Sequence, residues 1–181
     1  MLYIVVALKV EAQAFVEKYK LKKEKLSSFT LFVSEEIRLI ISGIGVQNAR
    51  EATQTLVNNY DITDEDIYLN AGICGANKEY EIGTLIEIGS LVFEGMTYTL
   101  DSKNAELNCV NAAISTDTLK IVDMESYGFY DAVIHNPAIK HFHILKVVSD
   151  HFEPQKVQKD ATKALLFKRL SAINEILFTK E

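Results

Sequence analysis

Three acidic residues follow apolar runs that have the length of buried strands. Glu11 comes after the run 3–7, Glu125 comes after the run "LKIV", and Asp150 closes the run "FHILKVVS". Carboxyl groups that meet at one edge of a sheet could carry general acid and general base chemistry. Each acid could instead cap a helix or lie on a solvated loop, because anions are favoured near a helix N-terminus by roughly 0.3–1 kcal/mol. Spacing alone leaves both interpretations open.

The other residues expected at this edge are mostly small or polar. Ligands of α/β sheets bind at the carboxyl ends of the strands, where loops and helix N-termini converge. The apolar runs lead there to Ser42, Gly43, the stretch 70–75, Met124 and Ser149. We therefore expect the three acids and these residues to lie around one site.

Motifs for a cofactor or a metal are incomplete. Gly43 and Gly45 form a G-x-G pair without the third glycine of the dinucleotide fingerprint, and no suitable strand and acid follow it. His141 and His143 would share one face of a strand, but no third ligand accompanies them. The sequence predicts no cofactor and no metal site.

Strand and helix patterns alternate along the chain. Helical stretches are expected over 10–19, 47–60, the segment after Glu125, and 157–178, whose core face would hold Leu165, Leu166, Leu170, Ile173 and Leu177. Strand-like runs cover 3–7, 28–34, 37–42, 66–76, 84–95, 107–115, 119–124 and 142–150, the second and third forming a hairpin. This alternation predicts an α/β fold with a central sheet covered on both faces.

Length and composition fit one soluble domain over residues 1–181. The net charge of −6 is spread along the chain, and the basic run 20–25 is interpreted as a solvated helix end, so no nucleic-acid surface is expected. No apolar run reaches the roughly 20 residues of a membrane span, and no signal peptide is evident. Cys74 and Cys109 lack a CxxC spacing, which favours reduced packing cysteines and a cytoplasmic protein.

Five motifs in order carry a family resemblance. The pieces "ALKVEAQ", "ISGIG", "NAGICGA", "VDMES" and "VVSD" resemble the nucleoside phosphorylase and nucleosidase superfamily, and most closely 5′-methylthioadenosine/S-adenosylhomocysteine nucleosidases. The resemblance spans nearly the whole chain in outline. It implies a phosphorylase-like, three-layer α/β/α fold with a central mixed sheet, a small nucleoside as substrate, and a homodimer.

The resemblance also implies a role for each matching residue. Glu11 would activate the attacking water, Met124 and Glu125 would hold the ribose, and Asp150, positioned by Ser149, would protonate N7 of the purine. Further substrate-binding residues would be Gly43, Gly72, Ile73 and Lys146, the last standing where the family usually has an arginine.

Cleavage of the bond between a ribose and a purine needs groups with these roles. The reaction builds oxocarbenium character on the sugar and negative charge on the leaving base. A protonated acid at N7 lets the base leave neutral, and an ordinary Asp, with a pKa near ~3.9, needs burial to keep that proton at neutral pH. A carboxylate on the other ribose face can orient water, which is worth about 10²–10⁴-fold.

Three functions are compatible with the resemblance. The phosphorylases bind phosphate with arginines and a serine in a "GSCG" turn, but this chain has Gly72, Ile73, Cys74 and Gly75 there, with Asn70 where one branch has arginine. Water is therefore the expected nucleophile. The alternatives are a phosphate-dependent phosphorylase and a non-catalytic nucleoside-binding domain, since a fold alone does not define an activity.

The segment before Asp123 is shorter than in the nucleosidases that the chain resembles. It normally supplies loops that recognise the base and the 5′ substituent, so the specificity for both stays open. The usual base-stacking aromatic residue has no clear equivalent, and Phe93, Tyr98 and Phe152 are the candidates to replace it.

Overall fold

The computed structural model describes residues 1–101, 105–116 and 118–178. Its helices are α1 (Lys9–Tyr19), α2 (Val46–Asn59), α3 (Ser126–Ile134) and α4 (Lys159–Phe178), with a 3₁₀ turn at Pro154–Lys156. Its strands are β1 (Leu2–Val6), β2 (Lys22–Leu26), β3 (Phe29–Val33), β4 (Ile37–Ile41), β5 (Ile67–Ala76), β6 (Leu85–Phe93), β7 (Met96–Thr99), β8 (Ala105–Cys109), β9 (Ile121–Asp123) and β10 (His141–Asp150).

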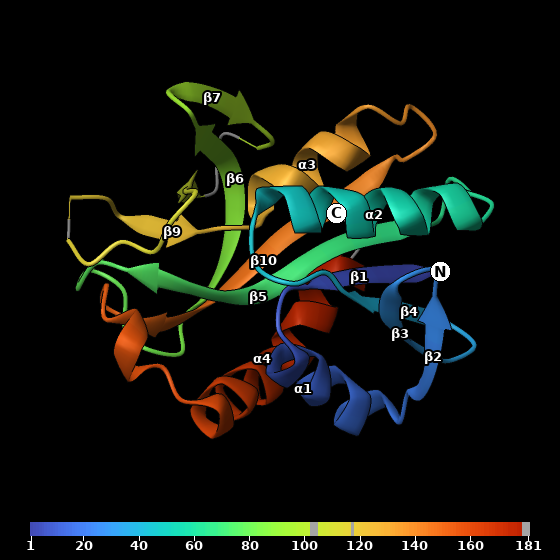
Figure 1. Cartoon of the computed structure of the whole chain (residues 1–181), viewed down its shortest axis with the longest axis horizontal. Coiled ribbons are helices and arrows are strands. Elements are labelled where there is room, and N and C mark those ends of the chain that lie inside the picture. Colours follow the sequence, from blue (N-terminus) through green and yellow to red (C-terminus); the bar gives the residue numbers. More distant parts are fainter. Residues whose placement is uncertain (102–104, 117, 179–181) are drawn as a thin grey trace.

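All ten strands belong to one mixed sheet. Strand β1 pairs in parallel with β4 and β5, and the antiparallel hairpin β2–β3 extends the sheet beyond β4. On the other side of β5 the strands curl: β5 pairs with β10, β10 with β6, β6 with β8, β8 with β9, and β9 returns to β5. These five strands form a closed ring, which Figure 1 shows as β6 rising out of the plane of β5 and β10.

Helices cover both faces of the sheet. Figure 1 shows α2 and α3 on one face and α1 and α4 on the other, and each pair packs against one of two buried hydrophobic clusters. The predicted three-layer α/β/α fold with a central mixed sheet is confirmed. Among the described residues, no helix is long and apolar enough to cross a membrane.

Helices α2 and α3 touch at Gly128. A Cβ atom there would lie 1.9 Å from the carbonyl oxygen of Val46, so only glycine allows this approach. The contact brings the start of α3 against the start of α2. It thereby places Glu125, which precedes α3, next to Gly45, which precedes α2.

The predicted elements differ from the structure in several places. The strand expected over 107–115 is β8, which ends at Cys109, so that 110–115 form no strand, and strand β7 was not expected. The basic run 20–25 is not a helix end, because Lys22–Leu26 forms edge strand β2, whose exposed charges suit a strand at the border of a sheet. The last helix begins at Lys159, since Pro154 starts a separate 3₁₀ turn. Its predicted core face is confirmed for Leu166, Leu170, Ile173 and Leu177, whereas Leu165 is half-buried.

Candidate functional site

A cavity of about 290 Å³ lies at the carboxyl ends of the strands. This is close to the lower end of the roughly 300–1,000 Å³ typical of small-molecule sites. It is lined by Leu8, Ile44, Ile73, Cys74, Gly75, Val110, Ala113, Ile114, Val122, Asp123, Met124, Glu125, Ser149, Asp150, Phe152, Pro154 and Val157. The structure thus gathers Glu125, Asp150, Met124, Ser149 and Ile73 around one space, as the pattern of strand ends predicts.

Glu125 is positioned by the two helix starts rather than by its own helix. It occupies the N-cap position of α3 but caps no N–H group of that helix. Its Oε1 accepts a hydrogen bond from the Gly45 N–H at 2.9 Å, and its Oε2 accepts one from the Met124 N–H at 3.3 Å. Burial and the nearby charge of Asp123 raise the pKa of Glu125 to about 7. The capping interpretation of Glu125 is therefore wrong.

Asp123 performs the capping instead. Its carboxylate accepts hydrogen bonds from the Ser126 N–H at 3.1 Å and from the Ser126 hydroxyl at 2.5 Å. The same carboxylate pairs with the Lys146 ammonium at 2.8 Å. Asp123 therefore ties the start of α3 to strand β10 beneath the cavity.

Lys146 is buried below the cavity and does not line it. Its exposure is 1%. Burial alone would lower the pKa of Lys146, but the neighbouring carboxylates of Asp123 and Glu125 raise it above the ordinary value. The surrounding acids therefore favour the charged form of this lysine. It was predicted as a substrate-binding residue, and the structure places it where it acts on Asp123 and Glu125 instead.

Three backbone N–H groups hold the carboxylate of Glu11 in place. Its Oε2 accepts hydrogen bonds from the N–H groups of Leu8 at 2.7 Å and Ala7 at 3.0 Å, and its Oε1 accepts one from Ile73 at 2.9 Å. Burial raises the pKa of Glu11 above its ordinary value. The carboxylate itself does not line the cavity, but its partners Leu8 and Ile73 do.

Gly72 makes room for Glu11. A Cβ atom at residue 72 would lie 2.7 Å from Glu11 Oε1, so a side chain there would displace the carboxylate. Gly72 does not line the cavity, and neither does Gly43, whose neighbour Ile44 does. Both glycines were predicted to bind substrate, and the structure gives Gly72 a place behind Glu11. We call Glu11, Asp123, Glu125 and Lys146 together the acidic floor.

Asp150 is the last residue of β10, where it lines the cavity and is half-buried. Its Oδ2 accepts a hydrogen bond from the Ser149 hydroxyl at 2.7 Å, and its Oδ1 accepts one from the Glu153 N–H at 2.8 Å. The Ser149 hydroxyl lies also 3.1 Å from the Cys74 carbonyl. Ser149 thus orients the acid, as the resemblance implies. We call residues 150–153 the rim turn.

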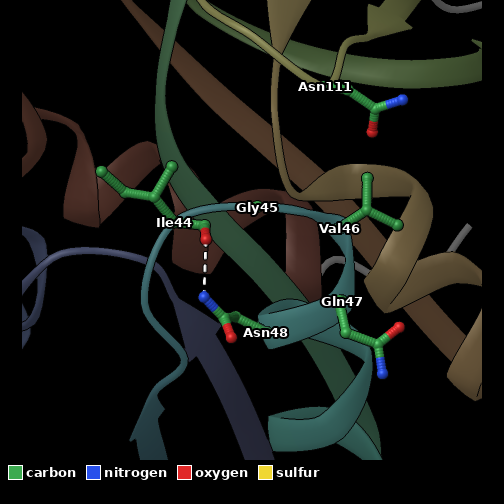
Figure 2. Close-up of a pocket in the computed structure, with 6 residues that line it drawn as sticks. All are labelled: Ile44, Gly45, Val46, Gln47, Asn48 and Asn111. Carbon is green, nitrogen blue, oxygen red and sulfur yellow. Dashed lines mark hydrogen bonds between the residues drawn. The ribbon is translucent and has the colours of Figure 1, made fainter.

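A second, open space adjoins the start of α2. It measures about 360 Å³ and is lined by Ile44, Gly45, Val46, Gln47, Asn48 and Asn111. Figure 2 shows the side-chain amide of Asn48 donating to the Ile44 carbonyl, at 2.7 Å, which closes the turn before α2. Because Ile44 lines both spaces, this turn forms part of the border of the cavity.

Val110 and Ile114 carried no chemical signal in the sequence, and they line the cavity from the segment between β8 and β9. Gly75, expected at this edge of the sheet, and Phe152, a candidate for base stacking, lie beside Asp150. Cys74, interpreted as a packing residue, is buried, and burial raises the pKa of its thiol. A neutral thiol is a poor nucleophile, which supports the packing interpretation.

The chain is similar to known proteins in its structure but not in its sequence. No protein-family model and no curated protein matches it in sequence. Solved structures do match it along nearly its whole length, and nucleosidases are among them.

The 5′-methylthioadenosine nucleosidase of Arabidopsis thaliana shares 16% identity with a TM-score of 0.81, the match covering 99% of this chain and 96% of that one. The 5′-methylthioadenosine/S-adenosylhomocysteine nucleosidase of S. pneumoniae, solved with a transition-state inhibitor, shares 13% identity with a TM-score of 0.79 and 97% of each chain covered. The corresponding nucleosidase of Colwellia psychrerythraea, in complex with adenine, shares 14% identity with a TM-score of 0.71, over 92% of this chain and 93% of that one. The chain therefore has the fold of these nucleosidases, as the sequence motifs predict.

Proposed function

We propose that the protein hydrolyses the N-glycosidic bond of a purine nucleoside or a 5′-thio nucleoside and releases the free base. The observation that carries the proposal is that Asp150 and Glu125 line one small cavity in a nucleosidase-like fold. One solved nucleosidase of this fold carries a transition-state inhibitor, and another carries adenine.

In this proposal Glu125 and Met124 bind the ribose. A carboxylate whose two oxygens each accept only one backbone hydrogen bond has lone pairs left for sugar hydroxyls. Since the pKa of Glu125 is about 7, the residue can accept from a hydroxyl as a carboxylate or donate to it as an acid. Asp150, oriented by Ser149, supplies the proton to the departing base.

Glu11 is proposed as the general base for water. Its raised pKa makes it a stronger base than an exposed glutamate, which favours proton abstraction near neutral pH. The hydrogen bond from Ile73 to Oε1 fixes the carboxylate just behind the cavity wall. In this proposal Gly72 leaves room for the carboxylate of Glu11, and the charge of Lys146 acts on Glu125. Gly43 precedes Ile44 in the turn at the border of the cavity.

The cavity favours water over phosphate as the nucleophile. Among the described residues that line it, none is an arginine or a lysine. The nearby Lys146 is committed to Asp123 at 2.8 Å. A phosphate dianion would enter a site that holds acids without a free cation, at a high electrostatic cost.

The test is base release with and without phosphate. A panel of purine nucleosides and 5′-methylthioadenosine is incubated in phosphate-free buffer, and free base and free sugar are quantified. We expect release of base and free ribose, or its 5′-thio analogue, independent of phosphate. Strict phosphate dependence with ribose 1-phosphate as product would make the protein a phosphorylase, and tight binding without release would make it a nucleoside-binding domain.

We further propose one domain over residues 1–181, a homodimer and a cytoplasmic location. The two cysteines of the chain are free and buried, as suits a reducing compartment. Exposed apolar side chains at Ile44, Met96 and Ile134 are compatible with a contact surface for a second copy. Sedimentation of the purified protein measures the assembly directly.

A further inference from the structure

We propose that Ser126 is a positioning residue for ribose binding, because its buried hydroxyl closes the turn that presents Met124 and Glu125 to the cavity. This inference rests on the proposed function and adds to it a residue that lies behind the cavity wall. The turn runs from Asp123, the last residue of β9, to Ser126, the first residue of α3. Its two middle residues line the cavity, and Ser126 does not.

The side chains of Asp123 and Ser126 join the two ends of this turn, and we call the pair the clasp. The Ser126 N–H donates to Asp123 Oδ2 at 3.1 Å, and the Ser126 hydroxyl donates to the same oxygen at 2.5 Å. Most residues at position 126 would supply the N–H, but the hydroxyl belongs to this side chain. Because Met124 and Glu125 lie between the joined ends, the clasp fixes their backbone on both sides.

Asn70 anchors the clasp to the centre of the sheet. Its Nδ2 donates to the Val5 carbonyl at 3.1 Å, which leaves its Oδ1 facing Ser126, 3.3 Å from the hydroxyl oxygen. Asn70 is 1% exposed and Ser126 is 0% exposed, so bulk water cannot replace a partner that either side chain loses. The hydroxyl therefore links the start of α3 both to β9 and to β5.

Glu125 depends on this clasp because its own contacts are few. Its two oxygens accept one backbone hydrogen bond each, from Gly45 at 2.9 Å and from Met124 at 3.3 Å. A group that binds a ligand has to be held within about 0.5 Å of its productive position, and surrounding hydrogen bonds do this. A loosened clasp should therefore weaken the ribose contact. The proposed base contact at Asp150 should persist, since Asp150 ends a different strand.

The ligands 9-deazaadenosine and 9-deazaadenine separate the ribose contact from the base contact. A carbon–carbon bond replaces the N-glycosidic bond of this nucleoside, so the protein cannot hydrolyse it during calorimetry. In Ser126→Ala we expect the affinity for the nucleoside to fall about 3- to 10-fold, the size of one hydrogen bond, and the affinity for the base to change less than about 2-fold. Ser126→Thr keeps the hydroxyl and should restore the nucleoside affinity.

Thr53→Ala is the matched control for this measurement. Thr53 is also 0% exposed, and its hydroxyl donates to the Ala49 carbonyl within α2 at 2.7 Å. Its removal should change neither affinity. An unchanged nucleoside affinity in folded Ser126→Ala, an equal loss for nucleoside and base, or an equal loss in Thr53→Ala overturns the proposal. If Ser126→Thr does not fold, the comparison of the two alanine variants still decides.

Methionine methyl signals report on the turn without any ligand. The chain has three methionines, and Met124 is the one in the turn, whereas Met1 and Met96 are exposed elsewhere. In protein labelled with ¹³C-methyl methionine, Ser126→Ala should shift or broaden the NMR signal of Met124 and leave the other two in place. Thr53→Ala should leave all three in place. An unchanged Met124 signal in folded Ser126→Ala overturns the proposal.

Neither measurement needs turnover, so the two proposals fail separately. A selective loss of nucleoside affinity in Ser126→Ala, in a protein that hydrolyses no nucleoside, would reject the hydrolase and keep the clasp. Hydrolysis by the unchanged protein, with the same nucleoside affinity in Ser126→Ala, would reject the clasp and keep the hydrolase.

Discussion

The acidic floor and the rim turn present acids to one cavity by opposite means. In the acidic floor, Glu11, Asp123 and Glu125 are at most 9% exposed and surround one buried ammonium. In the rim turn, Asp150 is half-buried and is held by its neighbour Ser149 and by the backbone of Glu153. The floor therefore depends on long-range charge balance, whereas the rim depends on local chain geometry. Variants of the floor should alter stability and its pH dependence, and variants of the rim should alter chemistry.

The largest effect is expected from Asp150→Asn in the rim turn. Asparagine keeps the shape but cannot transfer a proton, so turnover of a purine nucleoside should fall by about 10²–10⁴-fold. Affinity for a substrate analogue should change little, because the lost interaction develops in the transition state. Steady-state kinetics on a purine nucleoside and on a nitrophenyl riboside, whose leaving group needs no proton, measures the difference. Equal rate losses on both substrates would show that Asp150 is not the general acid.

Next in size is the loss of stability expected from Lys146→Met in the acidic floor. Removing the ammonium leaves Asp123 buried without its charge partner, which should lower the free energy of unfolding by roughly 3–5 kcal/mol. Urea unfolding of the unchanged protein and of Lys146→Met measures this loss in the free energy of unfolding. The double variant Lys146→Met/Asp123→Asn removes both charges and should recover part of the loss. An exposed ion pair contributes only about 0–1 kcal/mol to the free energy of unfolding. If Lys146→Met lowers that free energy by no more than this, the charge-balance account of the floor is wrong.

The smallest effect is the pH dependence that Glu125 contributes. Its pKa is about 7 in the folded protein against an ordinary 4.5, so between these pH values the folded state binds more protons than the unfolded state. The contribution to stability is therefore present at low pH and is lost as the pH rises through this window, by up to about 1.4 kcal/mol per unit. Glu125→Gln abolishes this contribution.

The measurement is the difference in unfolding free energy between the unchanged protein and Glu125→Gln across pH 4.5–7. Glu11 titrates in both proteins, so its contribution largely cancels. Glu51→Gln, on the exposed surface of α2, is the control and should show no such trend. If the difference does not change with pH, Glu125 is not the residue of the floor that binds the additional proton in the folded state.

The sequence predicted the layers and the edge of the sheet at which the acids meet. Buried strands and amphipathic helices have periods that can be read locally, and the carboxyl ends of parallel strands necessarily face one way. Hence Glu125 and Asp150 were expected in one site, and both line the cavity. Whether Glu125 capped its helix could not be predicted, because the answer depends on Gly45, a residue 80 positions away in the chain.

What the sequence missed depends on contacts across the sheet. No role was assigned to Asp123 from the sequence. Its carboxylate nevertheless caps the start of α3 and forms the ion pair with Lys146. The basic run 20–25 was assigned to a helix because exposed lysines suit a helix end and an edge strand equally well. The sequence named Phe152 together with Phe93 and Tyr98, and only the fold shows that Phe152 is the one of the three that lines the cavity.

The closed ring of β5, β10, β6, β8 and β9 has a consequence for how the protein can change its substrate. Asp150 ends one strand of the ring and Glu125 follows another closely, so their separation is set by backbone pairing that has no free edge to open. The segment 110–116, which supplies Val110, Ala113 and Ile114, only bridges two neighbouring ring strands. Mutations there can reshape the cavity while the spacing of the acids stays fixed, so the proposed specificity can change in evolution without a change in the proposed chemistry.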